Sequence, residues 1–98
     1  MTVSIKSGYK VELRTRRKNK DEALGLVEEL RRAGYVPSLR VTKRHYEVAI
    51  LHSEIQSKPE LREPVCQKLG EWLDEISDKE RRKRIAKAMQ KLKCLDNA

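Results

Sequence analysis

The chain has 98 residues, of which 39% are charged and 38% hydrophobic, and it carries a formal net charge of +8. A chain of this length holds one core, so we expect a single domain over residues 1–98. No apolar run approaches the roughly 18 residues that a membrane span needs, and the opening MTVSIKSGYK lacks a signal-peptide core, which predicts a cytoplasmic protein without membrane partners.

The first predicted element is a strand over residues 9–16. Two sets of side chains alternate there: Tyr9, Val11, Leu13 and Thr15 in one, and Lys10, Glu12, Arg14 and Arg16 in the other. Because successive side chains of a strand point to opposite faces, the pattern predicts one buried face and one open face that is mostly basic.

A helix is predicted next, from about Lys20 to Ala33. Asn19 is a typical N-cap, and apolar side chains recur at three to four residue spacing up to Leu30. Gly34 then supplies a usual helix stop. This is the pattern of an amphipathic helix that lies on a sheet.

Two strands follow, over residues 36–42 and 46–51. In the first, Leu39 and Val41 point inward and Arg40 points outward. The connection through Lys43 and Arg44 is short, which predicts an antiparallel hairpin.

Two further helices are predicted at about 58–76 and 78–95. Each is preceded by an S-x-x-E pattern, at Ser57 and Ser77, which is typical of a capping box. An apolar stripe runs along each helix, and the narrower stripe of the last one ends with Met89, Leu92 and Leu95.

The fold class that follows is α+β, in the order β-α-β-β-α-α. A right-handed crossover from the first strand to the second leaves a gap that the third fills. This predicts a three-stranded antiparallel sheet of order 1-3-2, a split βαβ arrangement covered on one face by helices. The sheet and first helix take about residues 9–52, and a C-terminal helical pair takes about 58–95.

Charge is unevenly distributed along the chain. Lys and Arg outnumber Asp and Glu by seven to one in residues 1–20 and by eight to three in residues 77–98, whereas acids are in excess in 21–34 and 54–76. This segregation predicts an open sheet face that binds a nucleic acid. The residues assigned to this interface are Lys10, Arg14, Arg16, Arg17, Lys18, Lys20, Arg40, Lys43 and Arg44. The alternative, that these side chains simply solvate an exposed sheet, remains open.

The stretch YKVELRTRRKNKDEALGLVEELRRAGYVPSLRVTKRHYEVAIL resembles the second half (β-α-β-β-α) of the LAGLIDADG homing-endonuclease fold and related archaeal paralogous-repeat proteins. In that family the open sheet face lies along the DNA major groove. The resemblance therefore implies that Lys10, Arg14, Arg16 and Arg40 face duplex DNA. The family's motif helix with its metal-binding acid is absent, because EALGLVEEL follows a strand and lacks a terminal Asp-Gly, so cleavage is not implied.

Cys66 and Cys94 are the only cysteines. If the last two helices turn near Ser77, the position opposite Cys66 is near residue 88, and Cys94 lies about six residues, or roughly 9 Å, further along. Because that separation exceeds disulfide reach, we predict two reduced cysteines. They form no CxxC pair and have no clustered His, which argues against zinc.

No catalytic pattern is found. His45 and His52 are isolated and are interpreted as polar residues at the hairpin ends, and neither a glycine-rich phosphate loop nor a nucleophile elbow occurs. We predict a non-enzymatic protein without cofactor, metal or small-molecule substrate. Its charge richness, with few Asn and Gln, resembles the bias of thermophilic proteins.

A second hypothesis is a protein-interaction module that uses the C-terminal helical pair. Trp72 lies on the apolar stripe and is interpreted as core, but if it is exposed and contiguous with Leu51, Ile55 and Leu95, these residues mark a partner site. We also predict a weak homodimer through the last helix or an edge strand, because one sheet face of this size covers only a few base pairs.

Overall fold

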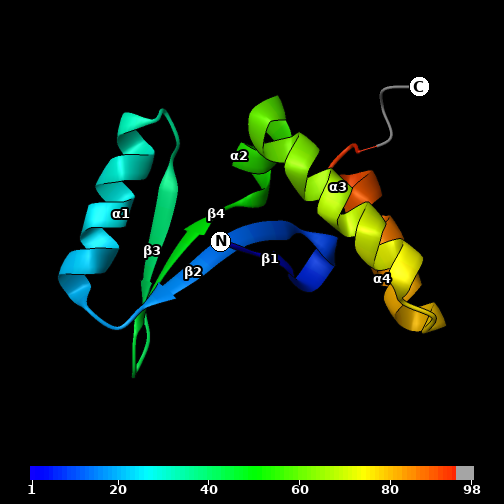
Figure 1. Ribbon diagram of the computed structural model, residues 1–98, viewed down its shortest axis with the longest axis horizontal. Helices are drawn as coiled ribbons and strands as arrows, with labels where there is room; N and C mark the ends of the chain where they lie inside the picture. Colours follow the sequence, from blue (N-terminus) through cyan, green and yellow to red (C-terminus); the bar gives the residue numbers. More distant parts are fainter. Residues whose placement is uncertain (95–98) are drawn as a thin grey trace.

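The computed structural model describes residues 1–94 and shows an α+β fold, as the sequence predicts (Figure 1). Leu95, which the sequence assigns to the last apolar stripe, lies outside these residues. The elements are β1 (Thr2–Ile5), the 3₁₀ turn η1 (Ser7–Tyr9), β2 (Val11–Arg17), α1 (Lys20–Arg32), β3 (Pro37–Val41), β4 (Tyr46–Ile50), α2 (His52–Ser57), α3 (Pro59–Glu75) and α4 (Lys79–Lys91).

The sheet has four antiparallel strands in the order β1-β2-β4-β3. The three predicted strands are neighbours in the expected order, since β2, β4 and β3 correspond to 1-3-2. The prediction of three strands is wrong, because β1 adds a fourth at the edge beside β2, with Val3 opposite Leu13 and Ile5 opposite Val11. The β1 segment is only four residues long, so its alternation gives a weak signal.

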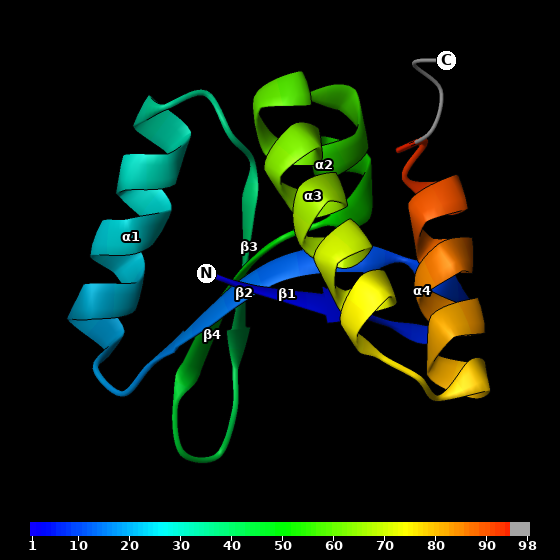
Figure 2. The same cartoon turned by 45° about the vertical axis from the view of Figure 1, so that its right-hand side comes forward.

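The helices pack on one face of this sheet. Val48 contacts Ala23 and Val27 of α1, whereas Val11 and Ile50 pack with residues of α2, α3 and α4. Cross-strand register places these strand residues on the same face, which confirms the predicted layer arrangement. In Figure 2, α1 lies at the left of the helical layer and α3 with α4 at the right, and the strands pass between and below them in this view.

Local capping agrees with the sequence at α1 and differs at the later helices. Asn19 accepts a hydrogen bond from the backbone N–H of Asp21 at 2.8 Å, and Gly34 has a φ of +94° after the last turn. The predicted Ser caps are wrong: Lys58 precedes α3 without a side-chain cap, and Asp78 caps α4. The Asp78 side chain accepts the hydrogen bond from the Glu80 backbone N–H that a serine cap would accept, so α4 begins at Lys79, one residue later than predicted.

The first long strand begins at Val11 rather than at Tyr9. Gly8 and Tyr9 have φ values of +76° and +63°, so the chain turns there between β1 and β2. A positive φ is unfavourable for a bulky side chain. The Tyr9 ring is nevertheless held against the core, and the Lys87 ammonium lies 5.0 Å from its centroid.

The prediction of reduced cysteines is wrong. Cys66 and Cys94 form a disulfide with a Cα–Cα distance of 5.5 Å. Regular helical rise up to Cys94 would keep the two sulfur atoms apart, but α4 ends at Lys91 and Lys93 has a φ of +62°. The backbone N–H of Cys94 then bonds the carbonyl of Met89 at 2.9 Å, so the chain curls back instead of advancing.

Candidate nucleic-acid interface

The face of the sheet opposite the helices carries three of the assigned arginines. By strand alternation Arg14 and Arg16 of β2 share this face with Arg40 of β3, because Arg16, Glu47 and Arg40 are cross-strand neighbours. The assigned central face therefore has the expected composition for these three side chains. It also contains Glu12 and Glu47, which pair with these arginines and reduce the positive charge of the face.

Glu47 lies at the centre of the arginine group. Its carboxylate is 3.6 Å from Arg14 Nη1, 3.8 Å from Arg16 Nε and 3.4 Å from Arg40 Nη1. The Glu47 side chain is only 8% exposed, whereas that of Arg16 is 60% exposed. The arginines therefore cover the carboxylate and keep their outer sides in solvent.

Glu12 is the second acid of this face. Arg40 Nη2 donates to Glu12 Oε2 at 3.2 Å, so Arg40 links both carboxylates. Glu12 Oε1 is buried and accepts no hydrogen bond within residues 1–94. The centre of the face thus holds three guanidinium groups and two carboxylates, and its excess of positive charge is small.

A larger excess of positive charge lies where β2 leaves the sheet. Arg17 is opposite Tyr46, and Tyr46 is opposite Val41, so the connection from β2 to α1 and the hairpin between β3 and β4 lie at the same end of the sheet (Figure 1). We call the cations of these two connections, together with the last residue of β2 and the first of α1, the basic end. Its members are Arg17, Lys18, Lys20, Lys43 and Arg44.

The five side chains of the basic end form no ion pairs within residues 1–94, although Asp21 and Glu22 follow Lys20 in the first turn of α1. Arg17 Nη1 donates only to uncharged oxygens, the Thr15 hydroxyl at 2.7 Å and the Arg16 carbonyl at 3.0 Å. The hairpin is closed by Thr42, whose hydroxyl donates to the His45 carbonyl at 2.6 Å.

Lys10 is separated from the other assigned residues. It precedes Val11, at the opposite end of β2 from Arg17, about 20 Å away at strand rise. Its carbonyl accepts a hydrogen bond from the backbone N–H of Lys6 at 2.7 Å. Eight of the nine assigned residues therefore lie on the central face or at the basic end, and Lys10 belongs to the β1–β2 turn.

The two histidines have different positions. His45 contributes only backbone groups to the hairpin turn. His52, at the first position of α2, accepts a bond from the Val11 backbone N–H and lies 3.2 Å from the Lys91 carbonyl. Within residues 1–94 no group of three His, Cys, Asp or Glu is arranged to hold a metal ion.

The residues of the interaction-module hypothesis do not form one exposed patch. Ile55 is fully buried, and Trp72 is partly buried against the core, while Leu51 is exposed. Trp72 nevertheless lines a pocket of about 420 Å³ between β1 and α3, with apolar walls formed mainly by Val3, Leu13, Leu61 and Val65.

Comparison of the chain with family models, curated proteins and solved structures finds no match. Across residues 1–94, no helix has both the length and the apolar character needed to cross a bilayer.

Proposed function

We propose that this is a small, non-enzymatic nucleic-acid-binding protein that contacts duplex DNA with the basic end and the adjoining arginines of the open sheet face. The observation that carries the proposal is the gathering of five cations without ion-pair partners in residues 1–94 at the end of the sheet next to that face. Arg17 is the one strand residue among them, and it points to the helix-covered face with Thr15, so it contributes charge at the edge of the interface. Neutralising phosphates releases counterions, which is the main source of affinity for such surfaces.

The central arginines supply orientation rather than net charge. A guanidinium has five N–H donors, and Glu47 and Glu12 use only some of those on Arg14, Arg16 and Arg40. The remaining donors are held in fixed directions, so less side-chain entropy is lost when a phosphate or a guanine edge is bound. In this proposal a duplex binds to preorganised arginines at the centre of the open face and to the strongly charged basic end.

The position of the aromatic side chains favours a duplex over a single strand. Stacking on single-stranded bases needs aromatic rings on the open face. Tyr46 instead packs with the core cluster of α1, and Tyr9 packs against the other core cluster. The open face presents guanidinium groups, and β-strands that carry such side chains can enter a major groove.

The decisive experiment reverses charge at the basic end. Lys18→Glu with Lys43→Glu removes two side chains that make no ion pair or side-chain hydrogen bond within residues 1–94. We expect the affinity for a random duplex to fall at least about tenfold, and the slope of log affinity against log salt to decrease by about 2. Fluorescence anisotropy at several salt concentrations measures both quantities.

The matched control is Lys68→Glu with Lys79→Glu, which changes the net charge equally on α3 and α4. If the control loses as much affinity as the test variant, binding depends on overall charge and the interface assignment is wrong. If the unchanged protein shifts neither duplex, single-stranded DNA nor RNA at moderate salt, the function itself is wrong. Reversing Arg14 or Arg16 is less suitable, because it would place another carboxylate beside Glu47.

The second candidate function is a protein-interaction module that uses the helical pair, and the apolar pocket at Trp72 favours it. Strand β1 lies at the sheet edge beside this pocket. An extended peptide that pairs with β1 could place one apolar side chain there. Trp72 fluorescence that shifts on addition of a partner protein, with no response to duplex, would favour this candidate over the first.

The predicted weak homodimer requires a surface other than the last helix. Leu92 is fully buried and Met89 packs against the core, so the α4 stripe is occupied within the protomer. The edge strand β3 is the better surface, because Val41 is 72% exposed there. We propose weak pairing through this edge. Sedimentation at several concentrations, with Val41→Lys as the disrupting variant, tests it, and a monomer throughout contradicts it.

We also propose that the protein works in the cytoplasm of a thermophilic, archaeal-type cell. Disulfides are rare in cytosolic proteins except in those of hyperthermophiles, and the Cys66–Cys94 bond together with the charge-rich composition fits that exception. Thermal unfolding followed by circular dichroism tests the proposal. A midpoint in the ordinary mesophilic range, about 45–65 °C, would contradict it.

A further inference from the structure

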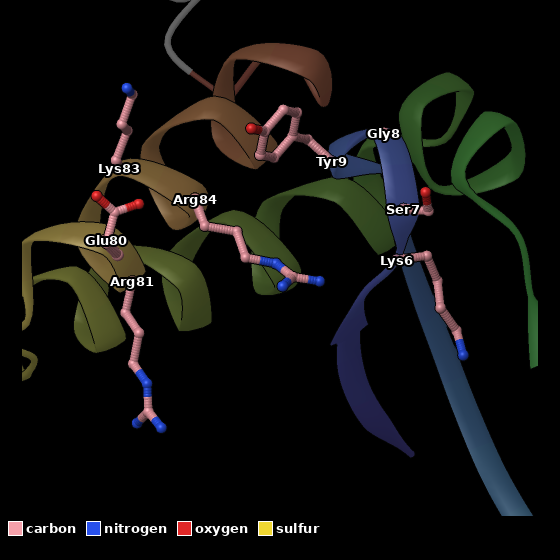
Figure 3. Close-up of a pocket in the computed structure, with 8 residues that line it drawn as sticks. All are labelled: Lys6, Ser7, Gly8, Tyr9, Glu80, Arg81, Lys83 and Arg84. Carbon is pink, nitrogen blue, oxygen red and sulfur yellow. The ribbon is translucent and has the colours of Figure 1, made fainter.

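A second concentration of positive charge lies outside the proposed interface. The β1–β2 turn and the first turns of α4 enclose a pocket of about 450 Å³, here called the turn pocket. Its walls are Lys6, Ser7, Gly8, Tyr9, Glu80, Arg81, Lys83 and Arg84. Figure 3 shows the guanidinium of Arg84 extending from α4 toward the turn, with Arg81 and Lys83 on either side of Glu80.

The charges of the turn pocket are poorly compensated. Four cations surround it and Glu80 is its only acid. The single ion pair among these side chains within residues 1–94 joins Arg81 to Asp78 at 4.0 Å, and both partners are largely exposed, so it neutralises little. Cations near the first turns of a helix are also disfavoured by the helix dipole. The side chains of Lys6 and Lys83 contribute no ion pair or hydrogen bond to the fold within residues 1–94.

Arg84 fixes the shape of the turn pocket. Its Nη2 donates to the Ile5 carbonyl at 2.9 Å, which ties α4 to the end of β1. One of its five donors is used in this contact, and the others remain for a ligand. The Ser7 hydroxyl and the ammonium groups of Lys6 and Lys83 make no hydrogen bond or ion pair within residues 1–94. Figure 3 shows both ammonium groups directed away from Arg84, so they become donors only when these side chains turn toward a ligand.

We propose that the turn pocket binds a phosphate-bearing anion. Arginine forks, ammonium groups and a hydroxyl are the donors that suit the tetrahedral, multiply charged phosphate group. The volume admits more than a single phosphate, and exposed lysine side chains reorient within nanoseconds to close on a ligand. The site is independent of the proposed DNA interface, because it lies at the opposite end of β2 from the basic end.

Pyrophosphate is the probe for the first experiment. In a ¹H–¹⁵N titration at constant ionic strength, we expect saturable shifts confined to residues 6–9 and 80–84. Lys6→Ala with Lys83→Ala should weaken binding about tenfold, because charge-assisted bonds are lost. The matched control, Lys18→Ala with Lys43→Ala, removes the same charge at the basic end and should leave the affinity unchanged.

Either of two results would overturn the proposal: no saturable shift at millimolar pyrophosphate, or equal loss of affinity in the control. A second arm identifies the source of the phosphate group, using one oligonucleotide with and without a 5′-terminal phosphate. Tighter binding of the phosphorylated form, lost in the Lys6→Ala, Lys83→Ala variant, assigns the turn pocket to a nucleic-acid end. Equal binding of both forms assigns it to small soluble phosphates. Failure of duplex binding elsewhere affects neither arm.

Discussion

The Nδ1 atom of His52 accepts a hydrogen bond from the backbone N–H of Val11 at 2.9 Å. Because Nδ1 is the acceptor, the ring proton of the neutral imidazole lies on Nε2, which faces the Lys91 carbonyl at 3.2 Å. One side chain thus connects the start of β2 with the end of α4. The isolated position of His52 in the sequence gives no sign of this role.

Replacing His52 should destabilise the fold. In His52→Ala the N–H of Val11, a residue with no exposed surface, loses its acceptor, and we expect a loss of about 1–3 kcal/mol in the free energy of unfolding. Urea denaturation measures it. His45→Ala is the control and should change stability by less than about 0.5 kcal/mol, since the His45 side chain bonds to nothing within residues 1–94. Equal effects of the two changes would refute the bridging role.

Breaking the disulfide should lower stability without changing the fold. The bond joins residues 28 positions apart, and closing such a loop stabilises a protein by about 2–4 kcal/mol. We expect that loss in Cys66→Ala with Cys94→Ala, measured by denaturation against the oxidised protein. Thiol titration of the denatured, unreduced protein checks the premise, and two reactive thiols would refute it.

Removing the charge of Glu47 should loosen the open face. In Glu47→Gln three guanidinium groups lose their shared carboxylate, and we expect destabilisation of about 1 kcal/mol, because Glu47 is buried but water still solvates the partly exposed arginines. Glu29→Gln, on the exposed side of α1, is the control and should be nearly neutral. A stability equal to that of the unchanged protein would show that the ion pairs of Glu47 do not stabilise the fold.

Stability should fall in acid through Glu54. The hydrogen bond from the Lys58 ammonium, and after it the one from the Val36 backbone N–H, hold the pKa of Glu54 below its ordinary value of 4.5. Since the folded pKa is the lower one, this stabilisation is complete above the unfolded pKa and is lost as the pH falls through the folded pKa. We expect the stability difference from Glu54→Gln to be constant near neutral pH and to shrink below about pH 4.5. A pH-independent difference would contradict the assignment.

The sequence predicts those parts of the fold in which one local pattern dominates. Residues 9–16 alternate strictly, and the segment after Asn19 carries an N-cap, an apolar stripe and a glycine stop. These patterns predict β2 to within two residues and α1 to within one. Strand β1 was missed because the turn before Lys10 uses positive φ at Gly8 and Tyr9, not a recognisable hairpin dipeptide. The disulfide was missed because a single left-handed residue, Lys93, redirects the chain.

In the candidate site, too, the features set by a local pattern were predicted and those set by contacts between distant residues were not. Alternation and charge placed Arg14, Arg16 and Arg40 on one open face, because side-chain direction follows from strand periodicity alone. Their neutralisation by Glu47 and Glu12 depends on cross-strand register, which a one-dimensional charge count does not contain. The turn pocket depends on contacts between residues far apart in the sequence, such as Arg84 and Ile5, which are 79 positions apart.

The hydrogen bond between Arg84 and Ile5 joins two segments that lie far apart in the sequence. Val3 and Ile5 of β1 also pack against the apolar cluster to which Ile85 of α4 belongs. Such sequence-distant contacts slow folding and leave early strands exposed. A chain that lacks α4 should therefore remain protease-sensitive, and protection should arise only when α4 is present to pack against β1 and the β1–β2 turn. Docking of α4 is then the step that commits the chain to its native state.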